Sequence, residues 1–316
     1  MSAPDGVYQF DPAAMFTSGP CFFVGATGSG KTNTLLSIIG RHGRKFEVVA
    51  AFAGSVGALV SLGKCLPQVA IHFPYDDTAR RKLAKLLDGQ QRATFRGGAK
   101  PILLIFDDLM FEGRGFVSSR EFRWLIFNSR ASNVWCLFTM QYCKHVPPEI
   151  RSQGFYAFLC PAKDMETRRM LVETFAPIGV GGFRSERHFF SVFDHCTRDM
   201  GCLVVDRSVL GPLGEDHPPY FWYRAPKVCE RPLAFGSGAL WRYNDRRYDP
   251  RWVDRPGAFG QLSSPEKKVP EPKPRARLRE IPPASQRMRI ANPNDRPHTR
   301  KTGYNRERAK LLVYGL

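Results

Sequence analysis

The sequence predicts an α/β fold with a mostly parallel central sheet. Apolar runs that are typical of strands alternate with helix-like runs from Phe10 to Ala225. Several of the strand-like runs, such as Cys21–Val24 and Ile102–Phe106, are apolar throughout and do not alternate with polar residues. Continuous apolar strands are typical of a parallel sheet that is covered on both faces. The order of the elements therefore indicates the α/β class.

The predicted elements can be placed in order along the chain. The predicted strands are Cys21–Val24, Val48–Phe52, Val69–Phe73, Ile102–Phe106, Val134–Thr139, Phe155–Cys160, Cys202–Val205 and Tyr220–Tyr223. The predicted helices are Lys31–Gly40, Asp77–Leu87, Ser119–Asn128, Asp164–Phe175 and Ser185–His195. No internal repeat is evident, and 316 residues are enough for one large core or for one core plus an appendage.

A glycine-rich junction joins the first predicted strand to the first predicted helix, and it fits the pattern GxxxxGK[ST]. The candidate nucleotide-binding residues are Gly25, Ala26, Thr27, Gly28, Ser29, Gly30, Lys31, Thr32 and Asn33. Glycines allow the tight turn that points backbone N–H groups inward, and the helix adds its positive dipole end. Lys31 is expected to reach the β- and γ-phosphates, and Thr32 to bind Mg²⁺. The alternative is a glycine-rich turn before a helix, but the strand-to-helix context favours a P-loop that binds a nucleoside triphosphate.

A second motif supplies carboxylates for the same site. The run PILLIFDDLM is an apolar strand that ends in Asp107 and Asp108. By position, Asp107 is expected to hold Mg²⁺ through water, and Asp108 to polarise the attacking water. Adjacent carboxylates repel one another unless a cation offsets them. A solvent-facing acidic pair is the alternative, and the P-loop upstream disfavours it.

The next strand, in VWCLFTMQY, ends near Gln141. If this strand lies beside the P-loop strand, Gln141 is expected to orient water or to sense the γ-phosphate. Without the two preceding motifs, a polar residue that caps the strand would be the better interpretation.

Other P-loop classes fit less well. No NKxD motif is present, which disfavours a GTPase. Leu87–Arg92 (LDGQQR) superficially resembles an ABC signature, but it also fits the polar end of a helix, and Gln141 stands where ABC ATPases carry a histidine. A nucleotide kinase is a further alternative, although no acceptor or lid motif is evident. A nucleotide-dependent interaction switch that hydrolyses ATP poorly also stays open.

The motifs together resemble the FtsK–HerA superfamily, and within it the poxvirus-type virion DNA-packaging ATPases of large DNA viruses. The residues that carry the resemblance are GATGSGKT, ILLIFDD, Asn128-Ser129-Arg130 leading into WCLFTMQY, and then VPPEIRSQGFYAFLC, CLVVD and YFWYRA. The resemblance extends over roughly Phe10 to Ala225. The chain departs from it in having Arg130-Ala131 where many packaging ATPases carry an Arg-His pair.

This resemblance implies an ATP- and Mg²⁺-dependent hydrolase that moves double-stranded DNA through an oligomeric ring, expected to be hexameric, with capsid proteins as candidate partners. It also implies an additional strand between the P-loop strand and the strand that carries Asp107. Lys31, Asp108, Gln141 and Arg130 become the candidate catalytic residues. Gln141 is then the γ-phosphate sensor, and Arg130 the candidate arginine finger toward a neighbouring subunit. Arg151 is the second choice for the finger.

Charge and composition divide the chain into two parts. The net charge is +18, which suggests a polyanionic partner. From Ser264 to Leu316 there are 14 Lys and Arg against 5 Asp and Glu, so this segment carries +9. We expect an ATPase domain over residues 1–255 and a flexible, Pro-rich basic tail over residues 256–316, which grips nucleic acid, improves solubility or docks on another protein.

The apolar runs and cysteines indicate the compartment. No run approaches the ~20 apolar residues that a transmembrane helix needs, and the N-terminus does not resemble a secretory signal. The 8 cysteines are scattered without a CxxC motif, and the spacing of Cys196 and Cys202 matches no usual zinc pattern. Reduced core cysteines are therefore expected. These features predict an intracellular protein, in the host cytoplasm or the virion if the chain is viral.

Overall fold

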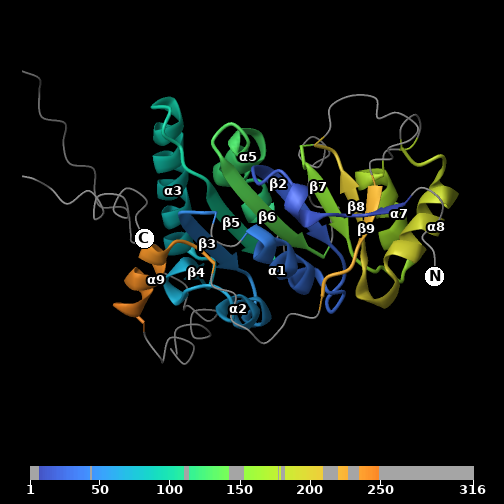
Figure 1. Cartoon of the computed structure of the whole chain (residues 1–316), viewed down its shortest axis with the longest axis horizontal. Coiled ribbons are helices and arrows are strands. Elements are labelled where there is room, and N and C mark those ends of the chain that lie inside the picture. The colour runs from blue at the N-terminus through green and yellow to red at the C-terminus, as the bar shows by residue number, and fades with distance from the viewer. Residues whose placement is uncertain are drawn as a thin grey trace, which may run out of the picture.

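The computed structural model describes residues 7–42, 45–109, 114–141, 153–176, 178, 182–208, 220–226 and 235–248. Within these residues, a sheet of nine strands has helices packed on its two faces (Figure 1). The α/β class predicted from the sequence is confirmed. The predicted tail over residues 256–316 lies outside the described residues.

The strands have the following bounds and order. They are β1 (Tyr8–Gln9), β2 (Gly19–Val24), β3 (Val48–Ala53), β4 (Ile71–His72), β5 (Ile102–Asp107), β6 (Val134–Met140), β7 (Tyr156–Leu159), β8 (Cys202–Asp206) and β9 (Tyr220–Tyr223). Across the sheet their order is β1-β9-β8-β7-β2-β6-β5-β3-β4.

The strand directions and order fit the predicted P-loop arrangement. Strand β8 pairs antiparallel with both of its neighbours, and the other described pairs are parallel. Strand β6 lies between the P-loop strand β2 and the acidic strand β5, and it pairs with both. The additional strand expected between these two motifs is therefore confirmed.

Two sets of helices cover the two faces of the sheet. One face packs against α3 (Asp77–Phe95), α4 (Arg114–Val117), α5 (Arg120–Asn128), α7 (Met165–Phe175) and α8 (Glu186–Cys196). The other packs against α1 (Lys31–His42), α2 (Val56–Gly63) and α9 (Gly238–Asp245). Each central strand divides its side chains between the two faces, which explains the continuous apolar runs in the sequence.

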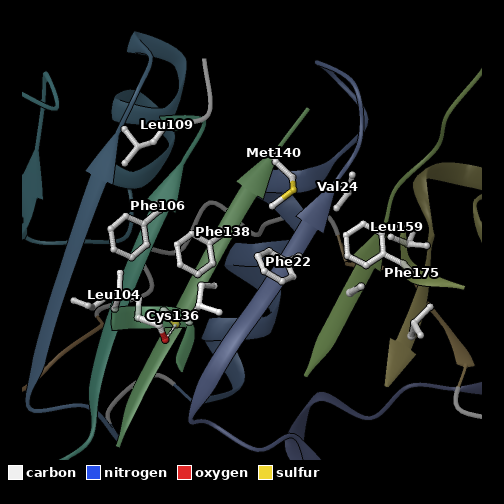
Figure 2. Close-up of a cluster of buried hydrophobic side chains, with 14 of the residues drawn as sticks. Phe22, Val24, Leu104, Phe106, Leu109, Cys136, Phe138, Met140, Leu159 and Phe175 are labelled. Atoms are coloured by element: carbon white, nitrogen blue, oxygen red, sulfur yellow. Dashed lines mark hydrogen bonds between the residues drawn. The ribbon is translucent and has the colours of Figure 1, made fainter. Parts of the chain in front are cut away.

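Stacked aromatic rings join the central strands on the face covered by α5. Phe106 stacks on Phe52 and on Phe138, with ring centroids 5.2 and 4.9 Å away, and Phe22 lies 5.7 Å from Phe138. Phe22, Phe106 and Phe138 lie side by side across β2, β6 and β5, with Phe175 of α7 on the far side of β2 (Figure 2). Each buried ring adds apolar area and a favourable ring contact. This row of packed rings holds together the three strands whose carboxyl ends carry the residues of the predicted site.

Two predicted elements have different bounds in the structure. The region predicted as the strand Val69–Phe73 forms a 3₁₀ turn, Gln68–Ala70, and the short strand β4. The helix predicted to end at Leu87 continues to Phe95, so Leu87–Arg92 lies in its interior. The buried Gln90 explains this continuation, because its amide donates to the carbonyls of Lys100, at 2.8 Å, and Ser132, at 2.6 Å. Local sequence patterns do not reveal a buried polar residue whose hydrogen-bond partners lie in other elements.

Among the described residues, the short elements β1, α2, α4 and α9 and the 3₁₀ turns Pro12–Ala14 and Arg198–Met200 were not predicted. Helix α9 belongs to the sheet domain, because Leu240 is in the core and the Ser237 hydroxyl donates to the Glu47 carbonyl at 3.1 Å. The described cysteines, Cys21, Cys65, Cys136, Cys160, Cys196 and Cys202, are buried, and no disulfide joins any of these six. None of the helices in the described part of the chain combines the length and the apolar character needed to cross a bilayer.

Candidate nucleotide-binding site

The three sequence motifs meet at one edge of the sheet. Strands β2, β5 and β6 are parallel, and the pairing of Val24 with Met140 brings the ends of β2 and β6 level. The N–H of Gly25 then donates to the Met140 carbonyl at 3.1 Å, which closes the start of the loop onto β6. Because parallel strands share their carboxyl edge, the P-loop, the Asp107–Asp108 pair and Gln141 lie together. The structure therefore brings together the motifs that the sequence separated by over a hundred residues.

Glycine is required at two places in the P-loop. Gly28 and Gly30 have φ values of +77° and +91°, in the region that other residues rarely adopt. Helix α1 begins at Lys31, directly after this turn. Its first N–H groups have no partner within the helix, and they carry the positive end of the helix dipole. The turn and the start of the helix together have the geometry of an anion site of the kind that binds phosphate.

Lys31 is folded back onto the loop that carries it. Its Nζ donates to the carbonyl of Gly25 at 2.7 Å and to the carbonyl of Ala26 at 2.9 Å. Burial lowers the pKa of Lys31, and the nearby acids, Asp107 and Asp108 among them, oppose that effect. The ammonium group is thus held beside the loop by carbonyl oxygens that phosphate oxygens can replace.

Thr32 and Asp107 form an oxygen pair that suits Mg²⁺. The Thr32 hydroxyl lies 3.5 Å from Oδ2 of Asp107, and Thr139 donates a hydrogen bond to Oδ1 of the same carboxylate. Asp107 is only 2% exposed, and burial raises its pKa, as does the charge of Asp108. A buried carboxylate of this kind is stabilised by a cation. No group of three or more His, Cys, Asp or Glu side chains that could hold a metal ion occurs among the described residues. Mg²⁺ is usually bound through one or two carboxylates together with phosphate and water.

Asp108 and Gln141 are in direct contact. The Gln141 side-chain amide donates to both carboxylate oxygens of Asp108, at 3.0 Å each. Asp108 has a φ of +61°, an uncommon conformation for a residue other than glycine. Its backbone N–H donates to the Thr139 hydroxyl at 2.9 Å, which holds the strained residue in place. The predicted hydrolytic acid and the predicted sensor therefore form one unit.

Two residues that support the acids were missed as site residues. Thr139 contacts both Asp107 and Asp108, and its place in a strand gave only the general signal of a polar residue near the edge. Gly54 follows β3, where a side-chain Cβ would overlap the Asp108 carbonyl, so only glycine fits. The sequence feature that could have indicated Gly54 is a glycine directly after an apolar run, but glycine is also a common turn residue.

The predicted arginine finger lies at the other edge of the sheet. Arg130 precedes β6, and its guanidinium lies over the ring of Phe155, 5.2 Å from the centroid. The length of β6 separates it from Gln141 by roughly 20 Å, so it does not reach the P-loop of its own chain. Arg151, the second choice, lies outside the described residues.

Comparisons with protein-family models and with curated proteins give no match. Similar solved structures include the genome-packaging NTPase B204 of Sulfolobus turreted icosahedral virus 2 in complex with AMP, with a TM-score of 0.41 and 12% identity over 61% of this chain and 94% of that chain. They also include EssC (ATPases 2 and 3) of Geobacillus thermodenitrificans, with a TM-score of 0.39 and 11% identity over 53% of this chain and 42% of that chain.

The cytoplasmic domain of the type VII secretion ATPase EccC of Thermomonospora curvata is also similar, with a TM-score of 0.40 and 12% identity over 69% of this chain and 28% of that chain. A viral packaging ATPase is thus among the structures that this chain is similar to. At these identities a likeness says nothing about activity.

Proposed function

We propose that this chain is an ATP-driven motor that moves double-stranded DNA, and that it packages viral DNA into a capsid. The observation that carries the proposal is the bidentate contact of Gln141 with Asp108 beside the P-loop. A site that only held nucleotide as a structural element would not need a strained acid tied to an amide on the neighbouring strand. Ordered hydrolysis needs both an acid that handles water and a group that responds to the γ-phosphate.

Each residue of the site has a separate role in the proposed hydrolysis. Lys31 exchanges the two loop carbonyls for β- and γ-phosphate oxygens. Thr32 and Asp107 would hold Mg²⁺, which neutralises developing negative charge when it is bound. Asp108 orients a water molecule and takes its proton as the water oxygen bonds to the γ-phosphorus and the bond to the β-phosphate oxygen breaks.

The Gln141–Asp108 contact must open for this reaction. While both carboxylate oxygens accept from Gln141, Asp108 has less capacity to orient water. A γ-phosphate gives the Gln141 amide an alternative acceptor, which frees Asp108. Release of phosphate restores the contact. The state of the nucleotide is thereby converted into the position of the Gln141 side chain.

Surface charge supports a DNA partner. Arg120 and Arg123 are exposed on α5, and the whole chain carries a net charge of +18. Contacts of arginine with the DNA backbone are independent of sequence, as a packaging motor requires, and they weaken as salt rises. The oligomer is proposed to be a ring of six copies with DNA at its centre, in the host cytoplasm or the virion.

Arg130 fits a role toward a neighbouring copy. It is exposed and lies away from the nucleotide site of its own chain. An arginine supplied by a neighbour adds positive charge as the transferred phosphoryl group loosens. It also makes hydrolysis depend on assembly, so that the subunits of a ring can hydrolyse ATP in a defined order.

The test is the steady-state ATPase rate of the full chain with and without double-stranded DNA, at low and high salt. A motor predicts Mg²⁺-dependent hydrolysis that DNA stimulates several-fold, with less stimulation at high salt. Asp108→Asn should retain nucleotide and lose hydrolysis. Slow turnover that DNA does not change would instead support the nucleotide-dependent switch, in which the Gln141–Asp108 contact is the resting state.

A further inference from the structure

The two sides of the P-loop have different neighbours, and this fixes the direction of a bound nucleotide. On one side lie β6 and β5, whose ends carry Gln141 and the acids that serve the γ-phosphate. On the other side lie β7, β8 and β9. A nucleotide whose γ-phosphate faces the acids extends its nucleoside toward β7, β8 and β9. This step rests on the proposed function.

Two segments border the loop on that second side. The first is the turn Arg198–Met200, which leads into β8, and the second is Arg224–Pro226, which follows β9. The side-chain amide of Asn33, the residue after the P-loop lysine and threonine, donates to the Pro226 carbonyl at 3.4 Å. A methyl group placed on Gly30 would lie 3.4 Å from Cε of Met200, so this thioether lies against the loop itself.

The turn is held in an uncommon conformation. Asp199 and Met200 have φ values of +48° and +62°, although neither is a glycine. Consecutive residues in this region cost free energy, and such strain is concentrated at ligand sites. Gly201 follows, where a Cβ would overlap the Cys196 carbonyl. The backbone is therefore fixed on both sides of Met200.

An ion pair ties the turn to the second segment. Arg224 lies 3.1 Å from Oδ2 of Asp199 and donates to the Arg198 carbonyl at 3.3 Å. One guanidinium thus contacts both the Arg198 carbonyl and the Asp199 side chain. Met200 itself is 52% exposed, although it lies against a loop built for phosphate. An apolar side chain fixed and exposed at this place is available to a ligand.

We propose that the turn Arg198–Gly201 is the wall of the nucleoside subsite, with the Met200 thioether packed on the base of a bound nucleoside triphosphate. A polarizable thioether makes favourable contacts with aromatic rings. It offers no strong hydrogen-bond donor or acceptor, so it contributes affinity for any base and little discrimination between adenine and guanine. Asp199 and Arg224 are positioning residues, because they fix the turn and do not touch the base.

The experiment compares a ligand that has a base with one that lacks it. Binding of Mg-ATPγS and of Mg-tripolyphosphate is measured by calorimetry for the full chain, Met200→Ala, Met200→Leu and the control Met165→Ala, an exposed methionine on α7. We expect Met200→Ala to weaken ATPγS about tenfold and to leave tripolyphosphate unchanged. Met200→Leu keeps the apolar volume and loses the sulfur, so it should lose less ATPγS affinity than Met200→Ala, and the control should stay close to the wild type.

Two results would overturn the subsite. One is unchanged affinity of Met200→Ala for ATPγS, and the other is an equal loss for both ligands, which would mean that Met200 acts through the shape of the phosphate loop. If the wild-type chain binds neither ligand, the phosphate site fails, and the proposed function fails with it. Arg224→Gln provides a second variant, for which the same selective loss of ATPγS affinity is expected.

Discussion

The two ends of strand β6 carry the predicted sensor and the predicted arginine finger, and they differ in what surrounds them. At the carboxyl end, Gln141 contacts Asp108, and Thr139 contacts both acids of β5. At the amino end, Arg130 lies on Phe155, which in turn packs against the backbone of Gly19. One end completes a site within its own chain, and the other offers an exposed cation beside an aromatic ring.

This difference shows which functions a single copy can perform. At the carboxyl end, Thr32 of the P-loop lies 3.5 Å from Asp107 and Gln141 donates to Asp108, so the groups proposed to bind nucleotide and to orient water all come from one chain. The amino end has no acidic partner for Arg130 among the ion pairs of the described residues. If Arg130 serves catalysis, it serves another copy. The predictions below test this division of roles.

The largest effect is expected for Lys31→Ala, which removes the cation at the carboxyl end. Removal of one charged donor from a transition state costs ~100- to 1000-fold in rate, and Lys31 also serves binding, so turnover should fall to background. The measurement is the ATPase rate together with nucleotide affinity. Lys85→Ala, an exposed lysine on α3, is the matched control and should behave as the wild type. Normal turnover of Lys31→Ala would show that the phosphate site does not lie at this edge of the sheet.

The second prediction concerns the amino end, and it requires mixed oligomers. Arg130→Ala and Lys31→Ala should each be nearly inactive alone. In an equimolar mixture, an interface that joins an intact P-loop to an intact Arg130 forms in about one quarter of random head-to-tail pairings, so about one quarter of the wild-type rate should return. The measurement is the ATPase rate across mixing ratios. If no ratio restores activity, Arg130 does not act across subunits.

The residues of the candidate site were easier to propose from the sequence than the residues that support them. Lys31, Thr32, Asp107 and Asp108 could be found because their spacing and strand context are local. Gln141 required the assumption that β6 lies beside β2, and the strand order confirms it. The contacts of Thr139 and the turn at Met200 depend on how distant strands align, which no local pattern encodes.

The same physical limit explains the errors in the elements. Helix α3 runs past its apolar positions because Gln90 finds partners in two other segments. Strand β1 has only two residues, and its place depends on pairing with β9, which comes over two hundred residues later. Burial and pairing across the sheet decide such elements, and intrinsic propensity does not.

A smaller effect is expected for Thr139→Val, which keeps the shape of the side chain. The change leaves Asp107 without one hydrogen-bond donor and the Asp108 N–H without its acceptor. Each loss weakens the positioning of a catalytic group, so kcat should fall by about tenfold, and more Mg²⁺ should be needed for half-maximal rate. Thr94→Val is the matched control, since its hydroxyl donates to the Gln90 carbonyl at 2.9 Å within α3. An equal loss in both variants would point to stability and not to the site.

The smallest expected effect is a change in stability at Asp107, where a substitution can distinguish a contribution to stability from a contribution to function. Burial and the charge of Asp108 raise the pKa of this carboxyl above its ordinary value of 3.8, so the ionised form destabilises the folded chain at neutral pH when no cation is bound. Asp107→Asn removes that charge and should raise the free energy of unfolding at pH 7 by about 1 kcal/mol, which corresponds to about 3 °C in Tm. Asp88→Asn, an exposed acid on α3, is the control and should change Tm little.

The sign of this effect with pH gives the sharper test. The penalty of the ionised carboxylate is present above the raised pKa of Asp107 and disappears as pH falls through it toward 3.8. The advantage of Asp107→Asn should therefore shrink toward zero in acid. Mg²⁺ with ATPγS should stabilise the wild type at pH 7 and stabilise Asp107→Asn much less, because the variant lacks the carboxylate that the cation needs. A variant that is less stable than the wild type at pH 7 without Mg²⁺ would show that hydrogen bonds, and not desolvation, dominate at Asp107, and the carboxyl end of β6 would then be organised without help from a metal ion.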